Sequence, residues 1–132
     1  MAIYGIGAFY DGSTDVSQDF IANGLAGVGW PRNEAPELHR FIASLKVGDI
    51  IYIKAAPLSN SDIRVRAIGF VEDNDLLDRE ASNGLVEAGR RVRWRVTDEF
   101  RISKPHERNN VRTNTLYEEH HPEVQAQIMQ RL

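Results

Sequence analysis

The sequence contains no cysteine, which excludes a disulfide scaffold, a thiolate zinc site and a cysteine nucleophile. Long apolar runs are also missing. The opening MAIYGIGAFY is apolar but short, has no basic flank and is followed directly by Asp11. It is typical of neither a secretory signal nor a membrane span, and we therefore expect a cytoplasmic protein that does not enter a membrane.

An excess of positive charge is missing as well. Sixteen Lys and Arg residues stand against nineteen Asp and Glu residues, which gives a formal net charge of -3. No overall positive field concentrates such a chain on nucleic acid, so any site for a polyanion must be local. The 132 residues have an ordinary composition, and we expect a single domain over residues 1–132.

Motifs for catalysis and metal binding are not evident. The chain has no GxSxG, Walker or HExxH motif, and no pair of carboxylates is singled out by its spacing. His120 and His121 are adjacent and would point in different directions on a helix, and with His106 they make no persuasive metal set. We therefore expect that the protein is not an enzyme and that it binds neither a cofactor nor a metal ion. A hydrolase stays open, because active-site geometry is spatial rather than sequential.

Apolar patterns predict about five short strands, mostly antiparallel because their connections are brief. Gly69 lies within one of them and marks a bulge or a close approach of neighbouring backbone. The expected strands are residues 3–10, 26–30, 50–55, 63–72 and 90–102.

Helical spacing occurs in three places. A short helix begins near Ser17, which can cap it, and Gly24 or Gly27 can end it. The clearest amphipathic helix covers residues 37–45, and the chain is predicted to be helical again from Leu116 onward. Val124, Ile128 and Leu132 share one face of that last helix. The pattern as a whole predicts an α+β domain, a small curled β-barrel of about five strands with two or three helices.

The central helix should cover one face of the strands. Its apolar residues are Leu38, Phe41, Ile42 and Leu45. We expect them to bury against a set of strand residues of matching periodicity. That set is Ile51, Ile53, Val65, Val92, Trp94 and Val96.

Aromatic and polar residues near the first strand are candidates for a ligand pocket. Trp30 and Tyr10 could wall a pocket in which a planar base stacks, although both could be core residues, as we expect Phe9 to be. Asp11 and Ser13, with Asp15, could accept hydrogen bonds from a base edge, or could serve only the turn and the next helix. Lys54 could reach into the opening of the same ligand pocket, or could point outward from its strand.

Basic charge is segregated in the second half of the chain. Residues 79–114 hold nine Lys and Arg residues against five Asp and Glu residues, a local net charge of +4. Arg91, Arg93 and Arg95 alternate with apolar residues and are predicted to share one strand face. Such a ladder is suited to phosphate binding, and the alternative is a solvated face neutralised by the acidic first half.

Three stretches, in this order, resemble the PUA-like superfamily, and within it the EVE, YTH and ASCH group of small barrels. They are AFYD at residues 8–11, LKVGDIIYI at 45–53 and AIGFVE at 67–72. The segment GVGWP at 27–31 also resembles a glycine–tryptophan element of some prokaryotic modification-dependent restriction systems. The likeness covers about residues 3–73.

This resemblance implies a non-catalytic reader of nucleobases, often modified or flipped-out bases, held in a pocket with aromatic walls. We therefore expect a nucleobase- or nucleic-acid-binding module of a prokaryotic or viral defence-related system, with nucleic acid or a nucleotide as its partner. One alternative is a small ASCH-like hydrolase acting on modified nucleosides, which needs a carboxylate or lysine facing the base. Another is a protein-interaction module that uses the terminal helix.

Overall fold

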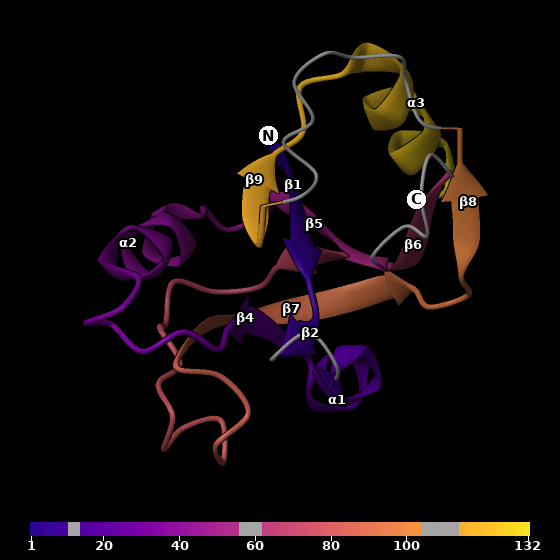
Figure 1. Ribbon diagram of the computed structural model, residues 1–132. Coiled ribbons are helices and arrows are strands. Elements are labelled where there is room, and N and C mark those ends of the chain that lie inside the picture. Colours follow the sequence, from indigo (N-terminus) through magenta and orange to yellow (C-terminus); the bar gives the residue numbers. More distant parts are fainter. Residues whose placement is uncertain (11–13, 56–61, 104–113) are drawn as a thin grey trace.

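The fold combines a curled sheet with three helices (Figure 1), and the computed structural model describes it over residues 1–10, 14–55, 62–103 and 114–132. The α+β class expected from the sequence is confirmed. The elements are β1 (Ile3–Gly7), β2 (Phe9–Tyr10), β3 (Thr14–Asp15), α1 (Ser17–Asn23), β4 (Leu25–Val28), α2 (Pro36–Ser44), β5 (Ile50–Ala55), β6 (Ile63–Val71), β7 (Ala88–Val96), β8 (Phe100–Ile102), β9 (Leu116–Glu118) and α3 (Pro122–Gln130).

The main sheet has seven strands, in the order β4-β7-β6-β5-β1-β9, with β8 paired to β6. All neighbours are antiparallel except β1 and β5, which are parallel. A separate two-stranded ribbon joins β2 to β3. The expected count of five strands is too low for three reasons. The segments 3–10 and 90–102 each divide into two strands, the predicted turn after the first strand contains β3, and β9 lies where a helix was predicted.

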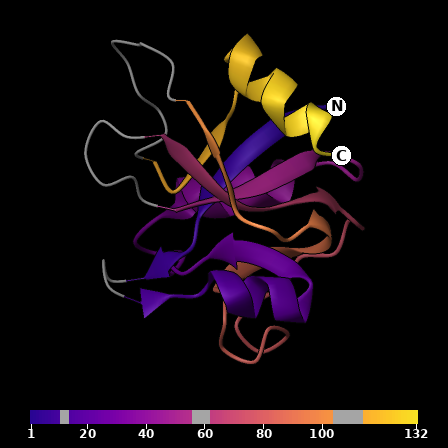
Figure 2. The ribbon, with the colours of Figure 1, turned by 90° about the vertical axis from the view of Figure 1, so that its right-hand side faces the viewer.

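Both faces of the sheet are covered, as Figure 2 shows, with α3 on one side and α1 on the opposite side. The α1–α2 core contains Phe20 and Ile42 from these helices, and Ile51, Ile53 and Val92 from the strands. The α3 core contains the residues that point the other way. These are Ile3, Ile50, Tyr52, Ile63, Val65, Ile68, Phe100, Ile102, Tyr117, Val124 and Ile128, with Phe70 and Val96 packed against them.

Two bulges change which face a side chain joins. Ile53 pairs with Ala67 and Lys54 with Val65, so Arg66 is an extra residue of β6. Likewise Ile68 pairs with Val96 and Gly69 with Trp94, so Arg95 is an extra residue of β7. An extra residue resets the alternation of side chains. For this reason Val65 and Val96 contact the α3 core, and their predicted packing against α2 is wrong.

Gly69 takes part in the second bulge, as its position in the strand predicts. A Cβ added there would lie 2.6 Å from the carbonyl oxygen of Arg93, which shows a close approach of neighbouring backbone. The predicted bulge is therefore confirmed.

Helix α2 lies where the sequence predicts it, with Ile42 and Leu45 buried. The fully buried guanidinium of Arg90 closes its C-terminal end by donating hydrogen bonds to the carbonyl oxygens of Ile42 (3.2 Å) and Leu45. Its other terminal nitrogen donates to the carbonyl oxygen of Asp73 at 2.6 Å. Cations are favourable at helix C-termini, so Arg90 is a structural residue of this fold.

The first helix, α1, begins at Ser17, but the acceptor at its start is Asp15, whose carboxylate accepts from the Ser17 amide at 2.9 Å. It ends at Gly24, which adopts the left-handed conformation with φ of 63°. Glycine tolerates this conformation, so the predicted helix end is confirmed. None of the helices within the described ranges is long and apolar enough to cross a membrane.

The C-terminal segment differs from its prediction. Residues Leu116–Glu118 form strand β9 beside β1, and the helix begins only at Pro122. The burial of Leu116 against β1 overrides local helical preference, and proline suits the first turn of a helix. Val124 and Ile128 are buried as predicted, whereas Leu132 lies beyond the end of α3 and is exposed.

Candidate anion-binding site

Arg64 and Arg101 face each other across strands β6 and β8, where their Cα positions are paired in the ladder. Arg64 lies between Ile63 and Val65, and both of these belong to the α3 core. Phe100 and Ile102, which flank Arg101, also belong to it. Successive side chains of a strand alternate in direction, so both arginines lie on the face opposite the α3 core.

Arg95, the extra residue of the bulge in β7, is exposed near the end of that strand. It lies between Trp94, which packs on the α1–α2 core, and Val96, which packs on the α3 core, whereas Arg93 pairs with Phe70 on the α3 side of the sheet. The bulge therefore divides the arginine ladder predicted for one face. Arg91 is engaged elsewhere, in ion pairs with Asp73 (3.2 Å) and Asp75 (3.0 Å), and these carboxylates raise its pKa.

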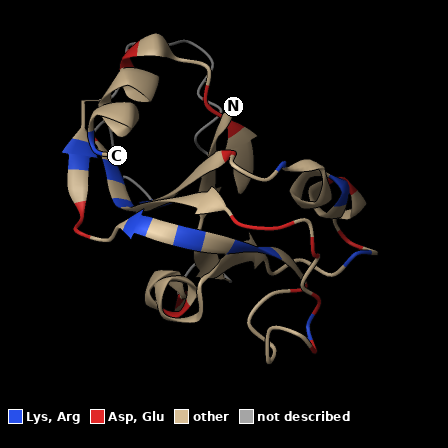
Figure 3. Ribbon diagram, turned by 180° about the vertical axis from the view of Figure 1, so that it is seen from behind, with Lys and Arg blue, Asp and Glu red and all other residues tan. Residues whose placement is uncertain are grey.

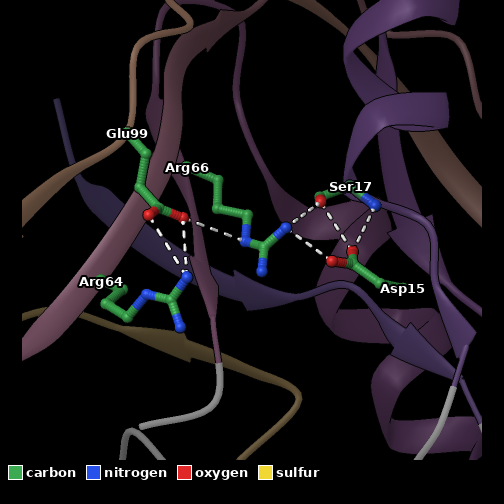
Figure 4. A network of polar contacts seen from close by, with 5 residues as sticks. All are labelled: Asp15, Ser17, Arg64, Arg66 and Glu99. Atoms are coloured by element: carbon green, nitrogen blue, oxygen red, sulfur yellow. Dashed lines mark hydrogen bonds and ion pairs between the residues drawn. The ribbon is translucent and has the colours of Figure 1, made fainter.

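A polar network holds two arginines of β6 in place (Figure 4). The Nη2 atom of Arg64 lies 3.3 Å from each Glu99 carboxylate oxygen, and the Arg66 Nε atom lies 3.5 Å from Glu99 Oε1. The Nη1 atom of Arg66 donates to Asp15 Oδ2 at 2.5 Å and to Ser17 Oγ at 3.1 Å. Glu99 thus bridges the two guanidinium groups, and Asp15 orients the second. We call Arg64, Arg66, Arg95 and Arg101 the arginine face.

The charge state of Asp15 follows from this network. Partial burial opposes its ionisation, but hydrogen bonds from the Ser17 hydroxyl and amide, together with the Arg66 charge, outweigh burial and lower the pKa of Asp15. Asp15 is therefore a carboxylate at neutral pH and a persistent partner for Arg66.

The arginine face carries more positive than negative charge. It has four arginines against two carboxylates, those of Asp15 and Glu99, which contact Arg64 and Arg66. Among the described residues, Arg95 and Arg101 are exposed and have no ion-pair partner. Arg64 and Arg79 each have one, and Arg66 and Arg91 each have two. Figure 3 shows basic stretches on neighbouring parts of β6 and β8 and along β7.

Trp30 is the most accessible of the aromatic residues singled out in the sequence, with 51% of its surface exposed. Its backbone is held, because the carbonyl oxygen accepts a hydrogen bond from His39 Nε2 at 2.6 Å. Tyr10 instead packs its ring against Gly29 and donates its hydroxyl hydrogen to the Leu85 carbonyl oxygen at 2.8 Å. Trp30 is free to stack on a ligand, and Tyr10 is largely a structural residue.

Phe9 is 42% exposed, so its predicted place in the core is wrong. Strand β1 ends at Gly7 and β2 begins at Phe9, so the alternation of β1 does not continue through the intervening Ala8. Asp11 and Ser13, two of the predicted ligand contacts, lie outside the described residues.

Trp30 and the arginine face lie at different ends of β7. Val28 pairs with Ala88 at the start of β7, and Trp30 follows two residues later. Arg95 lies seven residues further along β7 than Ala88, which corresponds to about 23 Å at the rise of a strand. The structure therefore does not place the predicted stacking residue and the arginines in one pocket.

Lys54 lies in a buried polar cluster. It lies neither at the opening of a ligand pocket nor on the outer face of its strand, which were the two predicted alternatives. Its Nζ atom lies 5.6 Å from the centroid of the Tyr117 ring. The hydroxyl oxygens of Tyr52 and Tyr117 are 2.7 Å apart, and Tyr52 donates to Glu119 Oε1 at 2.7 Å. Glu119 is only 1% exposed.

The direction of the hydrogen bonds in this cluster can be assigned. Tyr52 has one hydroxyl hydrogen and donates it to Glu119, so the hydroxyl of Tyr117 donates to Tyr52. Burial, together with neighbouring Tyr117 and Glu119, raises the pKa of Tyr52 well above its ordinary value. The chain of bonds ties β9 to β5 across β1, and with its members buried we interpret it as a structural brace.

Sequence reasoning missed this brace, although a signal was present. A Cβ at Gly5 would lie 2.3 Å from the Tyr117 ring, and Gly7 lies against the side chain of Lys54. Glycines two residues apart within a strand mark a place where another group approaches closely. In this strand they make room for Tyr117 and Lys54.

Other features of the surface fit an anion poorly. A shallow, open depression lies on the segment before β7 and contains three carboxylates against one arginine. It is lined by Asp78, Arg79, Glu80, Asn83, Gly84 and Glu87. Within the part of the chain that the structure describes, no group of three His, Cys, Asp or Glu side chains could hold a metal ion.

Comparison with known proteins places the chain in a family. None of the curated proteins compared with the chain matches it. A family model matches residues 31–119, a stretch that begins just after Trp30 and includes β5 to β9 and the whole arginine face. The chain therefore belongs to the family described as a domain of unknown function, DUF8426.

Proposed function

We propose that this domain binds nucleic acid or a nucleotide through the arginine face, whose guanidinium groups contact phosphates. The observation that carries the proposal is the pairing of Arg64 directly opposite Arg101, with Arg95 exposed near the end of the neighbouring strand β7. Like charges directly opposite on a sheet destabilise it. A bound polyanion would remove that repulsion, and arginine is the side chain best suited to phosphate oxygens.

The scaffold favours such binding. Arg64, Arg66 and Arg101 lie on strands β6 and β8, whose other face is buried in the α3 core, and Glu99 contacts two of the side chains. Phosphate contacts position a nucleic acid without reading its sequence. The arginine face therefore accounts for affinity, and base recognition needs a second element.

Trp30 is our candidate for that second element. Its half-exposed ring offers a surface on which a base can stack, an interaction that contributes about 1 to 3 kcal/mol. The length of β7 from Ala88, near Trp30, to Arg95 is about 23 Å at about 3.3 Å per strand residue, which is compatible with the roughly 4 to 16 nucleotides that an OB-fold covers. The resemblance to PUA-like barrels supports our further proposal of a cytoplasmic reader of a modified or flipped-out base.

A binding experiment with matched charge changes tests the proposal. We expect Arg95→Gln/Arg101→Gln to weaken binding of a short fluorescent single-stranded oligonucleotide, measured by anisotropy at low salt. The control is Arg32→Gln/Arg40→Gln, which removes the same charge from exposed positions next to and within α2. We expect this control to bind as the parent does. Equal losses in both variants, or no binding by the parent, would contradict the assignment.

A further inference from the structure

We propose that Arg64 and Arg66 form a preorganised seat for one phosphate group, with Glu99 as the residue that positions both guanidinium groups. The identity of the ligand as a nucleotide or nucleic-acid phosphate rests on the proposed function. The seat itself rests on the geometry of β6 and of the network in Figure 4.

The first step is that one carboxylate holds both arginines. Glu99 contacts Arg64 at 3.3 Å and Arg66 at 3.5 Å, and Asp15 holds the far end of Arg66 at 2.5 Å. Arginine normally loses much rotamer freedom on binding a ligand. In this network that freedom is already restricted before a ligand arrives.

The second step is that donors remain on both side chains. The Nε atoms of both side chains are buried, and that of Arg66 lies 3.5 Å from Glu99, so the donors left for a ligand are Nη1 of Arg64 and Nη2 of Arg66. The terminal nitrogens that are not bonded to Glu99 or Asp15 point to the same side in Figure 4, away from Glu99. The side chains are 30% and 19% exposed, so a small ligand can reach them.

The third step is the charge of the surroundings. Arg101 lies directly opposite Arg64 and is exposed. Together with Arg66 these residues carry three positive charges against the two carboxylates of Asp15 and Glu99. An anion at the seat would neutralise the remaining charge.

The fourth step is the chemistry of the ligand. A guanidinium presents its donors as a planar fork, and one fork satisfies a carboxylate. Two planar guanidinium groups, each with one terminal nitrogen left on the same side, suit the tetrahedral oxygens of a phosphate. A lysine supplies a point charge without this geometry.

The experiment is calorimetric titration of the full chain with three probes: inorganic pyrophosphate, a nucleoside 5′-monophosphate and the same nucleoside without phosphate. We expect the first two to bind and the bare nucleoside to bind at least about tenfold more weakly, as the loss of charged hydrogen bonds implies. Pyrophosphate binding alone would identify a site for free phosphate, and preferred binding of the monophosphate would identify a nucleotide site.

Charge-conserving variants separate a seat from a simple positive patch. Arg64→Lys and Arg66→Lys keep the charge and remove the fork, and we expect each to weaken pyrophosphate binding about tenfold or more. Arg40→Lys, on α2, serves as the control and should bind as the parent does. Unchanged affinity in a folded Arg64→Lys or Arg66→Lys variant would overturn the seat.

The role of Glu99 has its own test. Glu99→Gln makes the protein more positive, but we expect it to weaken pyrophosphate binding because the arginines lose their common anchor. Asp98→Asn makes the same charge change one residue away, at an exposed position, and should not weaken it. Tighter binding by Glu99→Gln would show that Glu99 only neutralises charge.

The outcomes distinguish the seat from the proposed function. If an oligonucleotide binds the arginine face but neither phosphate probe binds, the seat is wrong and the function stands. If pyrophosphate binds and no oligonucleotide does, the function is wrong and the anion seat stands. Thermal unfolding of each variant, compared with the parent, confirms that the affinities refer to folded protein.

Discussion

Arg64 and Arg101 lie directly opposite each other on antiparallel strands, and both side chains lie on the face turned away from the α3 core. Side chains in this relation have Cβ atoms about 4.5 to 5.5 Å apart, close enough for two positive charges to repel. Glu99 offsets the charge of Arg64, and no described residue forms an ion pair with Arg101. This arrangement costs stability, so stability and ligand binding should respond to Arg101 in opposite directions.

Arg101→Glu should therefore stabilise the fold and weaken oligonucleotide binding. A favourable cross-strand pair with Arg64 replaces a repulsive one, which is worth about 0.2 to 1 kcal/mol of unfolding free energy. Urea unfolding at low and high salt measures the gain, which should shrink as salt screens the charges. Arg101→Gln should fall between the parent and Arg101→Glu. A less stable Arg101→Glu variant would contradict the repulsion.

Gly5→Ala should destabilise the sheet by forcing Tyr117 out of its position. The added methyl group would lie 2.3 Å from the Tyr117 ring, and overpacking of this kind costs about 1 to 3 kcal/mol. The cost should be smaller when Tyr117→Leu is already present, because the shorter side chain leaves room. A double-mutant cycle based on urea unfolding measures this coupling. Strictly additive effects would show that Gly5 is needed for another reason.

Tyr52 should make the protein sensitive to alkaline pH. The unfolded chain ionises this phenol near pH 10, whereas burial, Tyr117 and Glu119 raise the folded-state pKa well above that value. Above pH 10 the unfolded state thus binds fewer protons than the folded state, and the unfolding free energy falls as pH rises. The contribution is fully present below pH 10.

Tyr52→Phe isolates that effect. The variant should be less stable than the parent at pH 8 by about 1 to 3 kcal/mol, because the buried Glu119 loses a hydrogen-bond donor. Its unfolding free energy should then decline less steeply than that of the parent between pH 10 and 11. Parallel declines in the two proteins, measured by urea unfolding at each pH, would exclude Tyr52 as the cause.

Trp30→Ala should leave stability almost unchanged, within about 0.5 kcal/mol, because the ring is half exposed. Oligonucleotide affinity should fall by about 1 to 3 kcal/mol as a stacking surface is lost. Trp94→Phe is the contrasting variant, because the indole nitrogen of Trp94 donates to the Phe20 carbonyl oxygen at 3.0 Å and its loss should affect folding. Unchanged affinity in Trp30→Ala would show that this ring does not stack on a base.

Strong local patterns made part of the fold predictable. The apolar run of β5, broken only by Lys54, has the predicted bounds, Ile50–Ala55, and the helical spacing of Ile42 and Leu45 correctly predicted the buried face of α2. The bulge at Gly69 also followed from a glycine inside a strand. In each case neighbouring residues in the sequence determine the local structure.

The composition of the arginine face was not predictable in the same way. The sequence around Arg95 alternates without interruption, so nothing in it shows that Arg95 is an extra residue opposite no partner. In β6 a signal exists, because two apolar residues, Ala67 and Ile68, follow an alternating stretch near Arg66. The pairing of Arg64 with Arg101 depends on strand register, which is set by tertiary packing rather than by either segment alone.

The salt dependence of oligonucleotide binding tests the central claim most directly. Each phosphate neutralised on a single strand contributes about -0.7 to the slope of log affinity against log salt. Four arginines predict a slope of about -2 to -3 for the parent, and Arg95→Gln/Arg101→Gln should make it shallower by about 1.4. Arg32→Gln/Arg40→Gln should leave the slope unchanged. A salt-independent affinity, or a slope that is the same in the parent and in Arg95→Gln/Arg101→Gln, would contradict phosphate binding by the arginine face.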